Sequence, residues 1–333
     1  MTTKPETGPS ALQSARPAVP KRRRVPVHGV LLLDKAAGRS SNDVLIQAKR
    51  LLNAEKAGHT GTLDPFATGL LPLCFGEATK FAQDLLESDK TYETTVHLGI
   101  TTTTGDTEGE MLAKALPEAL VDVTPERIEA VLARFRGPIL QTPPMYSALK
   151  RDGKPLYEYA RAGITLEREA RALTIHLLEM IDYVVPMLRL RVTCSKGTYV
   201  RVLGEDIGAA LGCGAHLQAL RRTAVGTLRL DDAVSLDTLA ALEEPARVAI
   251  LAPVDALLMT FPAVSLDETL AQRFLHGQRL ALDKEEVAVA EGATRVRVYR
   301  LGDGRLLGTG QMQDHAVLAP ERLIATGAHQ PAK

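Results

Sequence analysis

The sequence contains no tryptophan, and its 333 residues include only 7 tyrosines and 6 phenylalanines. Because aromatic side chains are so scarce, a tyrosine inside a polar motif is a candidate for a functional role. The three cysteines, Cys74, Cys194 and Cys213, lie far apart and form no CxxC pair. An odd number of widely spaced cysteines argues against a disulfide framework, so we expect reduced cysteines buried in the core.

Export and membrane segments are also missing. No apolar run approaches the ~20 residues of a membrane-spanning helix, and the N-terminus lacks the apolar centre of a signal peptide. We therefore expect a cytoplasmic protein with no membrane partner. The histidines, among them His28, His59, His97 and His176, show neither H-x3-H nor HExxH spacing. This absence of ligand patterns predicts that no metal is bound.

The charge is balanced overall but unevenly distributed. The formal net charge is zero, yet residues 231–333 carry 15 acidic and 10 basic side chains, which leaves 25 acidic and 30 basic in residues 1–230. A modest basic excess therefore accompanies the motifs described below. Such a bias permits a phosphate-binding surface without establishing one.

The length allows one large domain or two ordinary ones. Residues 1–24 are rich in Pro, Ser, Thr and Ala and end in KRRR, which predicts a disordered basic tail. This tail has two interpretations, a non-specific RNA contact or a solubilising segment. We expect a main domain over 25–250. Proline breaks near 250 and the short strand candidates EVAVAE, TRVRVYRL and RLLGTGQM predict a small β-rich domain over 251–328.

Local patterns predict an α+β protein. VHGVLLLDK has the composition of a buried strand, and Ser40 or Ser41 then caps a helix with apolar residues at helical spacing. TYETTVHLGI alternates as a strand does, and TPERIEAVLARFRG is a capped helix that Gly137 would stop. A strand, a glycine turn and a helix follow over 189–211. Because helices and strands alternate irregularly, we expect locally paired strands rather than a doubly wound sheet.

The segment GHTGTLDPFATGLLPLCFGEATKF, residues 58–81, places one carboxylate in a shaped turn. Asp64 lies between Gly61 and Gly69 and directly precedes Pro65. It either caps a turn or a helix N-terminus, or it serves as a nucleophile or general base. A single carboxylate does not fit the two-carboxylate glycosidase arrangement unless its partner is distant in sequence.

Two further segments carry polar and aromatic residues. CSKGTYVRVLGEDIG, residues 194–208, lacks the spacing of a P-loop. In an extended chain Tyr199 and Arg201 would share one face, and a buried arginine and Asp64 would each benefit from the opposite charge. QTPPMYSALKRDGKPLYEYARAG interleaves tyrosines with Lys and Arg, which suits an unpaired RNA loop and equally suits a helix with a solvated charged face.

Six segments together resemble one family, the bacterial tRNA pseudouridine-55 synthases of the TruB type. They extend over about 200 residues in the order of the family's motifs, and the G-T-L-D-P-x-A-T-G-x-L run within 58–81 is the most specific. The segments are LLLDKAAGRSSNDV (31–44), residues 58–81, KTYETTVHLGITTTTGDTEGE (90–110), GPILQTPPMYSALKRDGKPLYEYARAG (137–163), residues 194–208 and HLQALRRTAVGTL (216–228).

The resemblance implies a fold and an activity. The fold is a pseudouridine synthase catalytic domain with a mixed, mainly antiparallel sheet, followed by a small PUA-like RNA-binding domain. The activity is isomerisation of uridine 55 in the tRNA T arm, with the base flipped into a pocket that holds one catalytic aspartate. It requires no cofactor, its partner is the T-arm stem-loop, and no obligate protein partner is evident.

The resemblance also implies roles for individual residues. Asp64 is the catalytic aspartate, and its route, through C1′, C6 or the 2′ proton, stays open. Arg201 pairs with it, and Tyr92 stacks on the flipped uracil. The other implied residues line, support or contact the substrate pocket: Tyr199 as a second tyrosine, Asp106 as a second acid near the arginine, Leu220 as an apolar wall, His59 as a contact to the RNA loop, and Lys35 packed beneath.

Two alternatives from other classes remain. The chain could be a tRNA-binding or tRNA-folding protein in which Asp64 is only a turn residue. It could also be a phosphate-binding hydrolase built on the glycine-rich segments, although the Walker lysine and metal ligands are missing.

Overall fold

The computed structural model describes residues 23–325, and the tail expected over 1–24 lies almost wholly outside them. At the start of the described chain, the Arg24 guanidinium donates to the Ala54 carbonyl at 2.9 Å, so this end of the basic segment contacts the folded protein. The described chain forms one large sheet, a smaller sheet and two short ribbons. Within residues 23–325, no helix has the length and apolar character needed to cross a membrane.

The large sheet is mixed and mainly antiparallel, which confirms the expected fold class. Its strands are β1 (Gly29–Lys35), β2 (Ala57–His59), β3 (Thr68–Phe75), β4 (Lys90–Leu98), β7 (Gly137–Gln141), β10 (Arg171–Val184), β11 (Met187–Cys194), β12 (Ala215–Val225), β13 (Leu228–Arg229) and β14 (Val234–Ser235). They are ordered β14–β1–β3–β12–β4–β11–β10–β7, with β13 beside β12 and β2 beside β3. Within this sheet, β1 runs parallel to β14, and β3 runs parallel to β12.

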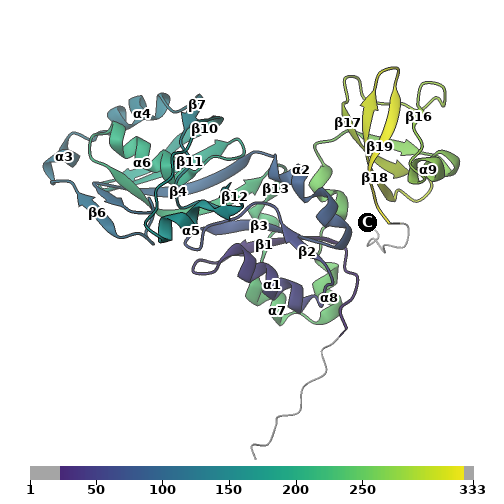
Figure 1. Cartoon of the computed structure of the whole chain (residues 1–333), viewed down its shortest axis with the longest axis horizontal. Helices are drawn as coiled ribbons and strands as arrows, with labels where there is room; N and C mark the ends of the chain where they lie inside the picture. The colour runs from purple at the N-terminus through teal and green to yellow at the C-terminus, as the bar shows by residue number, and fades with distance from the viewer. Residues whose placement is uncertain (1–22, 326–333) are drawn as a thin grey trace, which may run out of the picture.

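Helices flank the large sheet at separate places along it. Figure 1 shows α1 (Ser41–Leu51), α7 (Leu236–Ala241) and α8 (Glu244–Ala249) grouped beside β1 and β3, and α4 (Pro125–Ala133) and α6 (Val200–Ala210) beside β10 and β11. The shorter elements are α2 (Ala82–Leu86), α3 (Glu118–Val121), α5 (Leu156–Arg161), η1 (Gly76–Phe81), η2 (Leu230–Asp232) and η3 (Val254–Leu258). The ribbons pair β5 (Ile100–Thr102) with β6 (Met111–Lys114), and β8 (Lys150–Arg151) with β9 (Lys154–Pro155).

Strand β1 is apolar throughout because both of its faces are buried. Leu31 and Leu33 belong to one core, which includes the helix residues Val44 and Ala48. Val30 and Leu32 belong to a second core on the other face, which η3 also covers. A strand covered on both sides has no solvent-facing positions to be filled by polar residues. All three cysteines are likewise buried in the fold.

The predicted helix starts are confirmed, but one predicted stop is wrong. The Ser40 hydroxyl accepts the Asp43 N–H at 3.1 Å and caps α1, and Thr124 caps α4 in the same way. Helix α4 ends at Ala133, whereas Gly137 opens β7 with φ of +82°. Gly137 therefore serves the turn into the strand rather than the end of the helix.

The smaller sheet is ordered β15–β17–β18–β19–β16 and has a core of its own. Its elements are β15 (Ala263–Leu266), α9 (Glu268–Leu275), β16 (Leu280–Ala281), β17 (Arg295–Arg300), β18 (Leu306–Gln313) and β19 (Val317–Leu323). TRVRVYRL and RLLGTGQM form β17 and β18 as predicted. EVAVAE, residues 286–291, is not a strand, because Glu286 has φ of +54° and the following N–H turns back to the Leu282 carbonyl.

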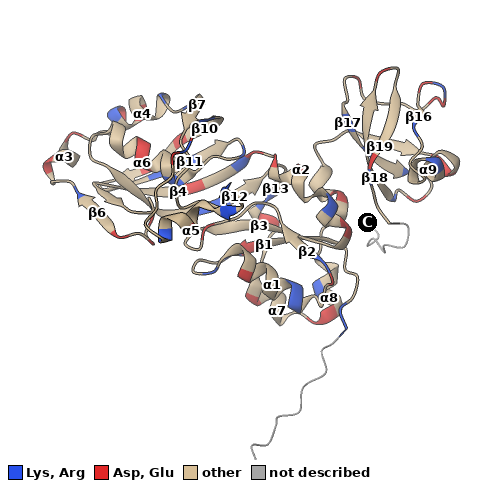
Figure 2. Ribbon diagram, in the orientation of Figure 1, with Lys and Arg blue, Asp and Glu red and all other residues tan. Residues whose placement is uncertain are grey.

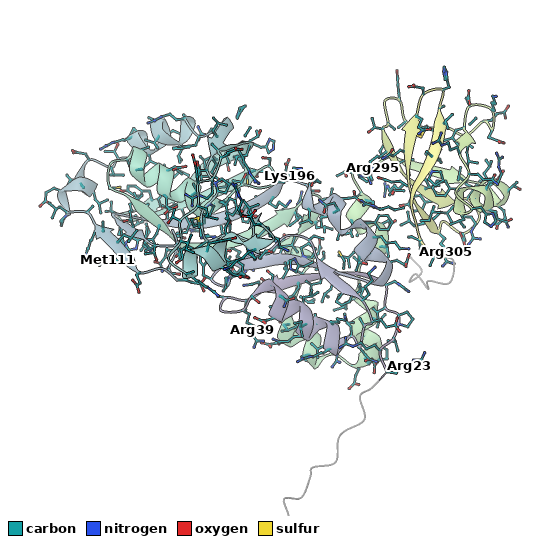
Figure 3. The ribbon with its side chains drawn as sticks, in the orientation of Figure 1. Arg23, Arg39, Met111, Lys196, Arg295 and Arg305 are labelled. Carbon is teal, nitrogen blue, oxygen red and sulfur yellow. The ribbon has the colours of Figure 1, made fainter. Side chains whose placement is uncertain are left out.

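The Asp84 side chain of α2 connects the smaller sheet to the part of the chain that contains the large sheet. The Asp84 side chain is only 6% exposed and accepts from Arg295 on β17 and from Arg322 on β19, each at 2.8 Å. Arg295 also pairs with Glu321 at 2.6 Å. In Figure 3 the labelled Arg295 lies on the side of the smaller sheet that faces α2. This cluster ties the orientation of the smaller sheet to the large one.

Asp84→Asn is expected to lower the free energy of unfolding by about 1–3 kcal/mol, because two charge-assisted hydrogen bonds to a buried carboxylate lose their anionic acceptor. Urea unfolding followed by circular dichroism measures the change. Asp89→Asn is the matched control: its side chain is 54% exposed, so the change should stay within about 0.5 kcal/mol. Equal effects in the two variants would contradict a stabilising role for Asp84.

Candidate active site

The loop that carries Asp64 connects β2 to β3 and is held from two sides. Ser41, the first residue of α1, accepts the Leu63 N–H at 2.8 Å and donates to the Leu63 carbonyl at 3.0 Å. The Asp64 carbonyl accepts the Ala67 N–H at 3.1 Å, which closes a tight turn. The backbone of this turn is therefore fixed on both sides of Asp64.

Lys35, at the end of β1, supports the same loop from below. Its side chain is buried, and its ammonium donates to the Ala67 carbonyl at 2.7 Å and to the Pro65 carbonyl at 3.2 Å. Burial lowers the pKa of Lys35 to about 8, although the nearby Asp64 carboxylate favours the charged form. Lys35 therefore lies beneath the loop and holds its backbone through these two carbonyls.

Gly69 makes the exit from the loop possible. It has φ of +99°, and a β-carbon there would lie 2.3 Å from the Arg222 carbonyl oxygen of β12. Gly69 pairs with Arg222 in the parallel register of β3 and β12. Only glycine permits both this conformation and this close approach.

Asp64 and Arg201 form the ion pair expected from the sequence. The Arg201 Nε atom lies 3.0 Å from an Asp64 oxygen and 3.5 Å from an Asp106 oxygen. The arginine side chain is 5% exposed and that of Asp106 is 3% exposed, whereas that of Asp64 is 37% exposed. Asp64 is thus the most exposed of the three side chains.

Both terminal nitrogens of Arg201 also bind the backbone. Its two terminal nitrogens donate to the carbonyls of Thr104 and Tyr146, each at 2.8 Å. The assumption of an extended chain was wrong, because Arg201 lies in the first turn of α6 and Tyr199 is the residue that precedes this helix. Burial raises the pKa of Asp64, and the guanidinium of Arg201 opposes this shift.

A cavity of about 270 Å³ adjoins the ion pair. This is close to the lower limit of roughly 300 Å³ for small-molecule sites and suits a flat heterocycle. Five of the residues named from the sequence line it: Asp64, Tyr92, Tyr199, Arg201 and Leu220. Burial raises the pKa of both tyrosines, so they present neutral rings to the cavity.

A second cavity, of about 450 Å³, lies on the other side of the same pair. It shares Asp64 and Arg201 with the first and is also lined by His59 and Asp106. Burial, followed by the positive charge of Arg222, lowers the pKa of His59, which favours a neutral ring. The structure thus brings seven of the eight predicted residues to two adjoining cavities, with Lys35 beneath.

Sequence reasoning missed several residues at these cavities. Arg222 and Lys90 are buried and line the first cavity, and Glu108 lines the second. Ser147 lines both. Arg222 and Lys90 stand within the quoted motifs, but nothing in a single sequence indicates that these cations are buried. Only their burial in the structure distinguishes them from other basic residues.

Comparison with known proteins assigns the family. The TruB family pseudouridylate synthase N-terminal domain matches residues 49–200, the tRNA pseudouridylate synthase B C-terminal domain matches 201–259, and the pseudouridine synthase II TruB C-terminal model matches 262–324. The chain is 62% identical over 311 residues to tRNA pseudouridine synthase B of Burkholderia mallei (strain ATCC 23344), with 93% of this chain and 98% of that protein covered. It is 60% identical over 323 residues to tRNA pseudouridine synthase B of Ralstonia pickettii (strain 12J), with 94% and 98% covered.

Solved structures agree with this assignment. A chain of the archaeal box H/ACA sRNP Nop10-Cbf5 complex superposes with a TM-score of 0.66 at 25% identity, with 90% of this chain and 86% of that chain covered. A chain of an H/ACA RNP bound to a substrate RNA containing 2′-deoxyuridine gives 0.67 at 25% identity, with 92% and 87% covered. Because curated relatives match at about 60% identity over nearly the whole sequence, the chain belongs to the TruB family of pseudouridine synthases and is an isomerase that acts on tRNA.

Proposed function

We propose that the enzyme isomerises uridine 55 in the T arm of tRNA, with the base flipped into the smaller cavity. The observation that carries this proposal is the partly exposed carboxylate of Asp64, paired with a buried Arg201 beside a cavity of nucleobase size. A stacked base is out of reach of such a group, so the nucleotide must leave the helix at a cost of roughly a few kcal/mol. Stacking on the Tyr92 ring recovers about 1–3 kcal/mol.

The chemistry exchanges one glycosidic bond for another. The C1′–N1 bond breaks, the uracil rotates and C5 bonds to C1′; C5 loses a proton and N1 gains one. Asp64 acts as an anion, by attack at C1′ or C6 or by removal of the 2′ proton. Arg201 maintains that anion against the effect of burial. The atoms balance without oxidation or an external group, so the reaction calls for no cofactor.

The ribbon β8–β9 and helix α5 are proposed to contact the RNA loop. They carry the exposed bases Lys150, Arg151 and Arg161 next to the second cavity, which Tyr157 and Arg161 line. The Arg161 guanidinium lies 5.4 Å from the centre of the Tyr157 ring. Cations and aromatic faces in this mixture suit phosphates and unpaired bases. The smaller sheet, within the domain proposed over 251–328, would supply a further RNA contact, and the enzyme would work in the cytoplasm.

The test is pseudouridine mapping on unmodified tRNA and on an isolated T-arm stem-loop. After incubation with the enzyme, carbodiimide treatment and reverse transcription should give one stop, at position 55, in both RNAs. A transcript with cytidine at position 55 is the control and should give none. A stop at another uridine, or no product from the wild-type enzyme, would refute the proposed position.

A further inference from the structure

Two buried cations line the cavity proposed for the base, and the mechanism above uses neither. Arg222 on β12 is 1% exposed and Lys90 at the start of β4 is 7% exposed. Figure 2 shows basic residues on β12 in the middle of the large sheet. Within residues 23–325 neither side chain forms an ion pair. The ion pairs there involve other basic residues, such as Arg201, Arg221 and Arg295. Burying a charge without a counter-ion costs several kcal/mol, so these positions call for an explanation.

The hydrogen bonds of the two cations differ. The Lys90 ammonium donates to the carbonyls of Leu85, Leu86 and Ser88, which uses all three of its N–H groups. Arg222 donates from Nε to the Leu70 carbonyl at 2.8 Å and from Nη2 to the Gly61 carbonyl at 3.1 Å, and it is hydrogen-bonded to the Tyr92 side chain. A guanidinium has five N–H groups, so Arg222 retains donors beyond these three partners.

Arg222 acts electrostatically on the groups around the cavity. Burial, followed by the charge of Arg222, lowers the pKa of Lys90 to about 8. The same two causes, in the same order, lower the pKa of His59. The charge of Arg222 also stabilises the anionic form of Tyr92 against burial. All three effects have the sign expected of a positive charge beside the cavity. A negative charge formed in the cavity would be stabilised by the same field.

We propose that Arg222 stabilises the negative charge that the uracil acquires during isomerisation. When C1′–N1 breaks, the electron pair stays on N1 and spreads to O2 and O4. The electron-poor C1′ either bonds to an Asp64 oxygen or loses its 2′ proton to form a C1′=C2′ bond. If Asp64 adds at C6 instead, the ring electrons move to O4. Every route places negative charge on the base, so the inference rests on the proposed base cavity and not on one route.

A purely structural role for Arg222 makes a different prediction. Its bonds to Leu70 and Gly61 connect β12 with β3 and with the segment before Asp64. If Arg222 only held this geometry, its loss would slow the reaction of every base equally. If it stabilises the leaving uracil, the loss should be smaller for a base whose anion is intrinsically more stable.

Arg222→Gln separates these cases, since glutamine keeps donors and removes the charge. Single-turnover rates are measured on T-arm stem-loops with uridine or 5-fluorouridine at the target position, because fluorine stabilises the uracil anion. On uridine we expect a loss of about 10²- to 10³-fold. 5-Fluorouridine has no proton to lose at C5, so its reaction is followed as loss of the starting nucleotide: C1′–N1 breaks, C5 bonds to C1′, and water adds across N1=C6 of the rearranged base. This rate should fall at least tenfold less than the rate on uridine. Filter binding of the stem-loop should stay within threefold of wild type. Equal losses on both substrates, or a uridine rate within threefold of wild type, would overturn the proposal.

A second measurement takes its main result from enzyme in which Arg222 is intact. Asp64→Asn enzyme is bound to the 5-fluorouridine stem-loop, and fluorine NMR follows the ionisation of the base at N3, which also puts charge on O2 and O4. The pKa of the bound base should fall below that of the free stem-loop, and Arg222→Lys in the same background should retain most of the fall. An unchanged or raised pKa would overturn the inference. Failure of the wild-type enzyme to modify uridine 55 would instead refute the proposed function.

Discussion

Asp64→Asn should abolish pseudouridine formation and leave tRNA binding nearly unchanged. Asparagine has the shape of aspartate but is neither a base nor a nucleophile at neutral pH, so we expect a loss of at least about 10³-fold in single-turnover rate. Binding should persist because the carboxylate contributes no phosphate contact, and its removal even relieves repulsion of an anionic RNA. Carbodiimide mapping measures the rate, and filter binding measures the affinity.

The control for this variant is an exposed acidic residue outside the cavities. Asp89→Asn serves, because Asp89 is exposed and pairs only with His176, at 3.3 Å, among the ion pairs of the described chain. It should retain wild-type activity. Substantial turnover by Asp64→Asn, at more than about a tenth of the wild-type rate, would show that Asp64 is the turn residue of the alternative interpretation.

Arg201→Met should lower activity and also shift its pH dependence. Burial raises the pKa of Asp64 and Arg201 opposes that rise, so removing the guanidinium raises the pKa further. The reaction needs the carboxylate, and the acidic limb of the rate profile should therefore move to higher pH. At neutral pH we expect a loss of about 10²-fold, because the partly exposed Asp64 carboxylate is no longer held ionised and in position by its buried partner.

Arg201→Lys is the matched control for the shift in the acidic limb of the pH–rate profile. Lysine keeps the positive charge, so the acidic limb should stay near its wild-type position. The rate should still fall, since an ammonium cannot reach the two carboxylates and the two carbonyls that the guanidinium fork contacts together. An acidic limb that moved equally in both variants, or in neither, would contradict the role of charge.

The sequence was sufficient to predict the elements whose signals are local. A serine cap and helical spacing located α1, alternation located β4, and two short strand candidates located β17 and β18. The pairing of Asp64 with Arg201 was predicted from their opposite charges and from the family resemblance. The local conformation of Arg201 did not, because a short glycine-containing segment is compatible with both an extended chain and the first turn of α6.

Features that depend on distant contacts could not be predicted. Arg222 and Lys90 resemble any surface cation in the sequence, and their importance lies in burial that the whole sheet creates. Asp84 meets Arg295 and Arg322 across more than two hundred residues. EVAVAE alternates like a strand, yet a left-handed residue at Glu286 breaks it. For Arg222, Lys90 and Asp84 the deciding contacts are tertiary, whereas at Glu286 a local turn overrides the alternating pattern.

The position of β12 has a consequence for how the protein is made. Strands β3 and β4 follow each other in the chain, yet β12 lies between them in the sheet and pairs with both. A chain still being synthesised thus exposes an unpaired edge of β4 until residues 215–225 leave the ribosome, and open edges invite aggregation. Because Leu220 and Arg222 arrive on that same strand, the base cavity is completed by the step that closes the sheet. Truncated chains that lack β12 would therefore be prone to aggregate and would have no catalytic activity.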